Sequence, residues 1–118
     1  MRRDALRLLD IVRAAAVVKD YLDGISQERF VAGGLHQDAV LRQLMVIGEA
    51  AYKITTELQH RAPHIPWLQI IGFRHRLVHD YFGLDIDAVW KIASSQLPLL
   101  HLQITALLVS EFPEDGSE

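Results

Sequence analysis

The sequence predicts an all-α protein, an antiparallel up-and-down bundle of four helices, or of five if Pro98 divides the last one. Apolar residues recur at intervals of three and four along almost the whole chain, as on one face of a helix. No stretch alternates between apolar and polar residues as a half-buried strand would, and glycines and prolines separate the periodic segments. With 118 residues, the chain is expected to form one domain over residues 1–118.

The first long helix is expected to begin near Asp4, which suits an N-cap, and to stop at Gly24. Its apolar residues lie on one face: Leu8, Ile11, Ala15, Val18 and Leu22. Ser26 can cap a short helical turn that runs through Phe30 and ends at the pair of glycines at positions 33 and 34.

Two further helices are expected on either side of a proline-marked loop. The first covers residues 37–58 and carries a stripe made of Val40, Leu44, Ile47, Ala51, Ile54 and Leu58. Pro63 and Pro66 mark the loop, and Pro66 suits the first turn of the next helix, where its missing N–H costs nothing. That helix is expected over residues 67–82, with Gly83 ending it.

The last helix is expected to be capped by Asp85 and to run from Ile86 to about Glu111. Its apolar stripe consists of Ile86, Val89, Ala93, Leu97, Leu100, Ile104 and Leu107. Pro98 should kink this helix or split it in two. Residues 113–118 are acidic and contain glycine and serine, so they are expected to fray.

Composition excludes several classes of function. The net charge of −3 argues against a protein that coats nucleic acid through bulk positive potential, although it allows a local basic site. The absence of cysteine excludes disulfides, thiolate metal sites and cysteine nucleophiles. The longest apolar run, residues 14–18, is far shorter than the ~20 residues that span a bilayer. We therefore expect a soluble, cytoplasmic protein without a membrane partner.

The polar residues best suited to catalysis or ligand binding gather on the third long helix. They are Arg74, His75, Arg76, His79, Asp80 and Tyr81. Arginine offers a rigid fork for a phosphate, histidine can move a proton at neutral pH, and tyrosine adds a hydroxyl. The same composition is also typical of a solvated helix face, so residue types alone leave both interpretations open.

Helical geometry limits how these side chains can cooperate. Arg74 and Tyr81 are seven residues apart and share a face if the helix is straight. His79 follows Arg74 by five residues, which places it about 140° around the axis. A common site for both therefore needs either a second copy related by a two-fold axis or a break in the helix between them. The composite arrangement favours a homodimer.

Two segments carry a family resemblance. Residues 74–81, RHRLVHDY, fit the pattern R-x4-H-x-Y, and residues 46–51, VIGEAA, form a second characteristic stretch. Together with the Leu-Asp-Ile-Asp run at residues 84–87 and the Leu97–Pro98 step, they make nearly the whole chain resemble the HepT family. HepT proteins are the toxin partners of MntA antitoxins within the HEPN superfamily of helical ribonucleases.

The resemblance implies a homodimeric, metal-independent endoribonuclease that needs no cofactor and cuts RNA at the dimer interface. His79 would be the general base or acid for attack of the ribose 2′-hydroxyl, and Arg74 would stabilise charge on the phosphate. His75 and Arg76 would bind substrate, with His75 standing where the family often has Asn. Tyr81 matches the tyrosine that MntA-type nucleotidyltransferases modify with AMP, and the added phosphate would repel RNA. Single-stranded RNA is the expected substrate.

Other interpretations stay open at this point. Glu49 can form a structural ion pair with an arginine of the third helix or can orient Arg74 at the site. His75 and His79 have the spacing of two zinc ligands, but Arg76 follows His75 where a zinc protease would have glutamate, and we expect no metal site. The chain could also be a non-catalytic helical partner of a nucleotidyltransferase, or a plain dimeric interaction module. Neither alternative requires a proton-transfer group such as His79 next to an arginine such as Arg74 that binds phosphate.

Overall fold

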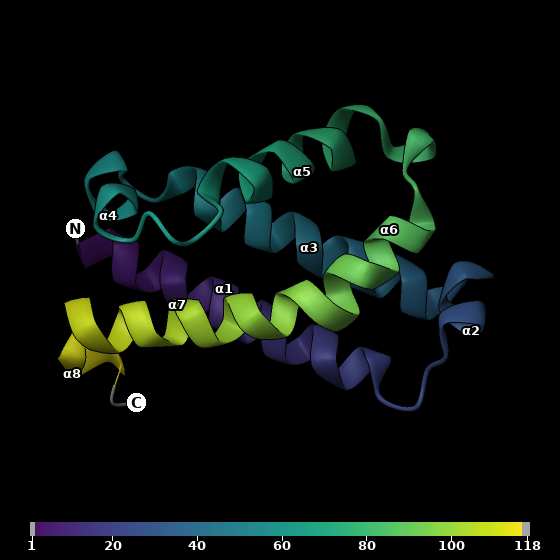
Figure 1. Cartoon of the computed structure of the whole chain (residues 1–118), viewed down its shortest axis with the longest axis horizontal. Helices are drawn as coiled ribbons and strands as arrows, with labels where there is room; N and C mark the ends of the chain where they lie inside the picture. The colour runs from purple at the N-terminus through teal and green to yellow at the C-terminus, as the bar shows by residue number, and fades with distance from the viewer. Residues whose placement is uncertain (1, 117–118) are drawn as a thin grey trace.

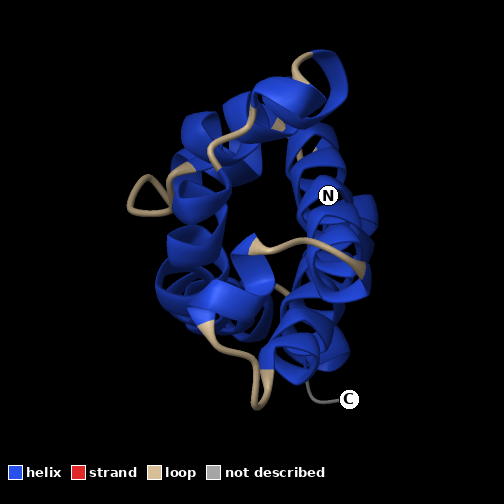
Figure 2. Cartoon of the chain, turned by 90° about the vertical axis from the view of Figure 1, so that its right-hand side faces the viewer, coloured by secondary structure: helices blue, strands red, loops and turns tan. Residues whose placement is uncertain are grey.

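The computed structural model describes residues 2–116, which are almost entirely helical and contain no strand (Figures 1 and 2). The long helices are α1 (Arg2–Leu22), α3 (Leu35–Lys53), α5 (Trp67–His79) and α7 (Leu97–Glu111). Short helices lie between or after them: α2 (Gln27–Val31), α4 (Thr56–Arg61), α6 (Ile86–Lys91) and α8 (Pro113–Gly116). The long helices alternate in direction in a body of 41 × 29 × 20 Å (Figure 1). The expected all-α fold is confirmed.

The predicted apolar stripes form a single core. Helix α1 packs against both α3 and α7, and its residues Leu8, Ile11 and Val18 are fully buried. Helix α5 packs mainly on α3, so it lies at one edge of the bundle with its outer face uncovered (Figure 1). This position matters for function because α5 carries the polar cluster identified in the sequence.

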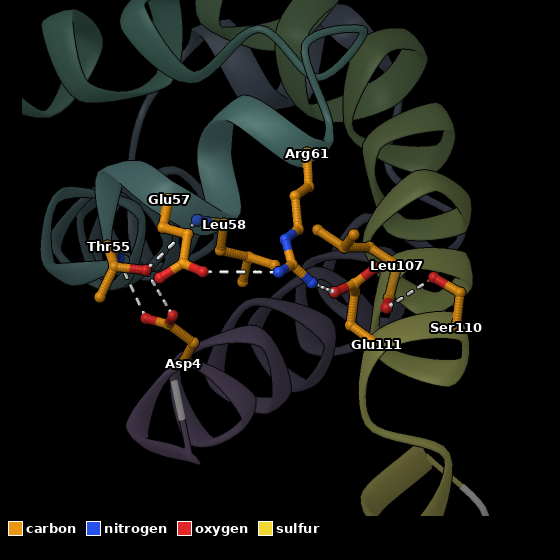
Figure 3. A network of polar contacts seen from close by, with 8 residues as sticks. All are labelled: Asp4, Thr55, Glu57, Leu58, Arg61, Leu107, Ser110 and Glu111. Atoms are coloured by element: carbon orange, nitrogen blue, oxygen red, sulfur yellow. Dashed lines mark hydrogen bonds and ion pairs between the residues drawn. The ribbon is translucent and has the colours of Figure 1, made fainter.

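Contrary to expectation, Asp4 does not cap the first helix, because α1 already begins at Arg2. The Asp4 side chain is only 1% exposed and accepts hydrogen bonds from Thr55 N at 3.0 Å and from Thr55 Oγ1 at 2.6 Å (Figure 3). These two bonds offset the cost of burying a carboxylate. Asp4 therefore ties the N-terminal helix to the turn between α3 and α4.

The expected helix over residues 37–58 is two helices. Helix α3 ends at Lys53, Ile54 is extended (φ −73°, ψ 137°), and Thr55 caps α4 by accepting a hydrogen bond from Leu58 N at 3.3 Å. A threonine side chain that bonds the backbone competes with helix continuation, and the bend here still buries Ile54 and Leu58. The apolar periodicity alone could not reveal this turn.

Helix α4 is anchored to the C-terminal end of α7 through Arg61. Its guanidinium donates to Glu111 Oε1 at 2.8 Å and lies 3.4 Å from Glu57 Oε1 (Figure 3). The hydrogen bond to Glu111 and the negative charge of that carboxylate raise the pKa of Arg61 above its ordinary value. Because the pair is exposed, it adds little stability, but it brings α4 against the end of α7.

Helix α5 ends earlier than expected, at His79 rather than Phe82. Asp80 leaves the helical conformation (φ −140°, ψ 47°), and residues Tyr81–Gly83 form a separate 3₁₀ turn. The turn is closed by a hydrogen bond from Gly83 N to the carbonyl oxygen of Asp80 at 3.1 Å, and the Asp80 carboxylate lies directly beside Gly83. The break therefore follows His79 and does not separate Arg74 from His79, and Tyr81 no longer continues the helix face of Arg74.

Pro98 does not split the last helix. The helical run is continuous from Ile86 to Glu111, with a π-helical segment, Ile92–Gln96, directly before Leu97 and Pro98. Proline cannot donate the usual hydrogen bond and crowds the preceding turn, and a wider π turn accommodates both effects. By length and composition this run could cross a membrane, but its residues Val89, Ile104 and Leu107 are buried inside the bundle.

The end of the chain also differs from expectation. Residues Pro113–Gly116, the first part of the tail expected to fray, form the short helix α8. Residues 117 and 118 of the expected tail lie outside the described part of the chain.

Candidate active site

Arg74 lies on the face of α5 that packs against α3. Its Nη2 atom is 2.8 Å from Glu49 Oε2, and its guanidinium carbon is 5.5 Å from the centre of the Tyr52 ring. The side chain is only 27% exposed. A Cβ atom added at Gly48 would lie 2.2 Å from Arg74 Cβ, so only glycine lets the two helices approach this closely. Helix α3 thus determines where the guanidinium can go.

Glu49 is shared between two cations. Besides Arg74, its carboxylate lies 3.4 Å from Lys53 Nζ on the same helix. The sequence suggested two roles for Glu49, and both involve an arginine of α5. The structure contains such an ion pair, with Arg74. The group is 40% exposed, so the pair stabilises the fold by about 1 kcal/mol or less. Its main physical effect is to restrict the orientation of the Arg74 guanidinium.

Arg74 opens onto a surface cavity of about 350 Å³ between α1, α3 and α5. Two further arginines line it, Arg7 from α1 and Arg42 from α3, together with Asp10, Glu49 and apolar side chains. Arg42 has no ion-pair partner among residues 2–116, whereas Arg7 lies 4.0 Å from Asp10. Sequence analysis missed both arginines. Arg42 precedes Glu49 by seven residues, and this helical spacing places the two on one face of α3.

His75 and His79 lie on the outer side of α5, and both are exposed. Their ring centres are 4.3 Å apart, with the rings tilted by 45°. Within residues 2–116 neither ring has a hydrogen bond or an ion pair, and no bond joins Arg74 to His79. The structure therefore brings the two histidines together and holds Arg74 on a different face of the helix. Arg76 is exposed on the same helix.

Tyr81 lies just beyond the helix, in the 3₁₀ turn. Its ring meets that of Phe82 edge to face, with centres 5.6 Å apart, and 39% of Tyr81 is exposed. Phe82 is completely exposed. Both aromatic rings therefore lie at the surface, next to the end of α5.

No group of three or more histidine, aspartate or glutamate side chains within the described residues could hold a metal ion. His75 and His79 on their own supply only two ligands, fewer than zinc sites in proteins take.

Comparison with known proteins identifies the family of this chain. Residues 11–107 match the family described as "Ribonuclease HepT-like". The chain belongs to the HepT-like ribonuclease family. The resemblance seen in the sequence and the expected class of enzyme, a ribonuclease, are confirmed at the level of this family.

Three relatives illustrate the match. The chain is 32% identical over 97 residues to "Putative RNase MJ1380" of Methanocaldococcus jannaschii, covering 82% of this chain and 89% of that protein. It is 34% identical over 93 residues to "Probable ribonuclease HepT" of Thermococcus cleftensis, covering 79% and 84%. It is 31% identical over 101 residues to "Putative RNase TTE0752" of Caldanaerobacter subterraneus, covering 86% and 90%. No solved structure matches the chain.

Proposed function

We propose that this HepT-like chain is the toxin of a HepT/MntA-type pair and acts in the cytoplasm as a metal-independent endoribonuclease on single-stranded RNA. The observation that carries the proposal is the exposure of most polar side chains of the RHRLVHDY segment, namely those of His75, Arg76, His79, Asp80 and Tyr81. Its helix, α5, packs mainly against one neighbour, so His79 and Tyr81 at its end are open to an RNA strand or to a modifying enzyme.

The chemistry needs no metal ion. The ribose 2′-oxygen attacks the adjacent phosphorus, the bond from phosphorus to the 5′-oxygen breaks, and the products end in a 2′,3′-cyclic phosphate and a 5′-hydroxyl. His79 carries one of the two proton transfers. Arg74, oriented by Glu49, stabilises the charge that builds up on the phosphate oxygens. Arg76, exposed on the same helix, contacts the RNA backbone.

A second copy of the chain supplies what one copy lacks. Helix α5 is continuous through His79, so a break cannot bring His79 round to Arg74. The outer face of α5 suits a close crossing with another helix. Leu68 is 84% exposed there, and no atom lies within 4 Å of a Cβ built at Gly72. An exposed glycine in a helix costs about 1 kcal/mol relative to alanine, and close approach of a second backbone would account for it.

Modification of Tyr81 tests the proposed regulation. Incubation with an MntA-type nucleotidyltransferase, ATP and Mg²⁺ is expected to add AMP at Tyr81 and to suppress cleavage, because the added phosphate repels RNA. Intact-mass spectrometry measures the addition. Tyr81→Phe should show no mass increase, while Tyr52→Phe, which changes another exposed tyrosine, should be modified like the wild type. Addition that persists in Tyr81→Phe would refute the assignment.

Metal removal tests the chemistry. Cleavage of a single-stranded RNA is expected to proceed at an unchanged rate after dialysis against EDTA, because side chains perform both the proton transfer and the charge stabilisation. The rate is measured on a fluorescently labelled oligonucleotide before and after dialysis. Activity that is lost in EDTA and returns with Zn²⁺ would instead identify the paired histidines as metal ligands.

A further inference from the structure

The cavity beside Arg74 contains more positive charge than the function described above uses. It lies over α3, which runs between α1 and α5 (Figure 1). Most side chains of α3 that line it stand at positions 42, 45, 46 and 49, a spacing that places them on one face of the helix. Arg7 comes from α1 and Arg74 from α5. Three arginines from three helices therefore line one opening of about 350 Å³.

The three arginines differ in how far nearby carboxylates compensate their charge. Arg74 Nη2 lies 2.8 Å from Glu49, and Arg7 Nη1 lies 4.0 Å from Asp10, at the outer limit of an ion pair. Arg42 is exposed and has no ion-pair partner among residues 2–116. Three arginines and two carboxylates leave the lining with one net positive charge, and Arg42 carries it.

One uncompensated positive charge matches one phosphodiester, which carries a single negative charge. The chain as a whole has a net charge of −3, so its binding of RNA depends on local cations. Arginine suits this ligand, because its planar fork donates two hydrogen bonds to the oxygens of one phosphate. The volume of the cavity falls within the range of small-ligand sites, about 300–1,000 Å³, so a phosphate group fits in it.

The position of Arg42 along α3 separates it from the group that Arg74 binds. The Arg74 guanidinium is held at Glu49 and at the ring of Tyr52. These residues follow Arg42 by seven and ten positions, which is about 10–15 Å along the axis of α3. A strand whose scissile phosphate lies at Arg74 therefore presents a different phosphate to Arg42.

We propose that Arg42 binds a phosphodiester of the RNA next to the one that is cleaved, so that the cavity is a second phosphate site. The inference rests on the proposed ribonuclease function, in which Arg74 stabilises the scissile phosphate. It implies a preference for RNA chains over dinucleotides, because only a chain with a second phosphate occupies both positions.

Substrate length tests this assignment. A dinucleoside monophosphate contains only the scissile phosphate, whereas a single-stranded decanucleotide also reaches the second site. For Arg42→Gln, the KM for the decanucleotide is expected to rise by about tenfold while kcat stays within about twofold of the wild type, because the lost contact exists before and during cleavage. The variant should cleave the dinucleotide at the rate of the wild type.

Salt dependence gives a second readout that needs no cleavage. A 2′-O-methyl decanucleotide lacks the attacking hydroxyl, so fluorescence anisotropy can measure its Kd at several salt concentrations. In Arg42→Gln, the loss of one phosphate contact should reduce the slope of log Kd against log salt by about 0.7, the value for a single strand. Arg42→Lys should keep the slope of the wild type, because lysine retains the charge.

A matched control separates a local contact from the loss of charge. Arg29→Gln removes the same charge from another exposed arginine, on α2, which contributes no side chain to the cavity. This variant should bind and cleave the decanucleotide like the wild type. Because Arg42 and Arg29 are both exposed, the two variants should keep the thermal unfolding midpoint of the wild type, which calorimetry measures.

Each outcome has a distinct meaning. A decanucleotide KM or a salt slope that stays at the wild-type value in Arg42→Gln would overturn the inference and leave the proposed function standing. Equal losses on the dinucleotide and the decanucleotide would also overturn it, because Arg42 would then act at the scissile phosphate or in the fold. Sedimentation of Arg42→Gln as a smaller species than the wild type would show that Arg42 joins two copies of the chain. Absence of cleavage by the wild-type protein would overturn the proposed function itself.

Discussion

His79→Ala is expected to lower cleavage of single-stranded RNA by about 10²–10⁴-fold, because it removes a proton-transfer group from the reaction. This loss corresponds to about 3–5 kcal/mol of barrier. His79 is exposed and makes no hydrogen bond within residues 2–116, so its removal should leave the fold intact. Initial rates on a labelled oligonucleotide, measured at several enzyme concentrations, give the effect.

The same variant should fail to arrest growth when it is produced in a host cell, while sedimentation shows the oligomeric state of the wild type. His60→Ala is the matched control, since it removes an imidazole from an exposed position away from α5. Growth arrest and cleavage by purified His79→Ala at wild-type levels would disprove the assignment of the site to α5.

Gly48→Ala is expected to have the largest effect on stability. The new Cβ would lie 2.2 Å from Arg74 Cβ, 2.8 Å from its Cγ and 3.2 Å from its Cα, so the backbone of α5 must move away from α3. Overpacking of this kind costs about 1–3 kcal/mol, and contact with backbone places the expected value near 3 kcal/mol. Urea unfolding followed by circular dichroism measures the change in the free energy of unfolding.

Activity should fall together with stability in this variant, because displacement of α5 moves Arg74 away from Glu49. Gln69→Ala is the control on α5, because Gln69 is exposed and lies on another face of the helix than Leu68 and Gly72, and its stability should change by less than about 1 kcal/mol. Equal stability of Gly48→Ala and wild type would contradict the close packing of α3 and α5.

Local signals in the sequence were sufficient for most of the fold. The three-and-four spacing of Leu8, Ile11 and Val18 places them on one helix face, and the structure buries all three. Ser26 and Asp85 cap the helices that they were expected to cap, since a cap depends on only a few neighbouring residues. The predicted helix boundaries are wrong where a long-range contact or a tight turn overrides the local sequence signals. Asp4 and Thr55 are 51 residues apart and bond each other, and Gly83 closes a turn against Asp80.

For the site, the sequence by itself determined the residue types and their order along α5, and with them the membership in a ribonuclease family. Only the tertiary structure decided which of these residues face one another. Packing of α5 on α3 turns Arg74 toward Glu49 and Tyr52, and leaves His75 and His79 together on the open side. The physical reason is that position along a helix sets the angle of a side chain, whereas the neighbouring helix determines which angles are covered and which remain open to a substrate.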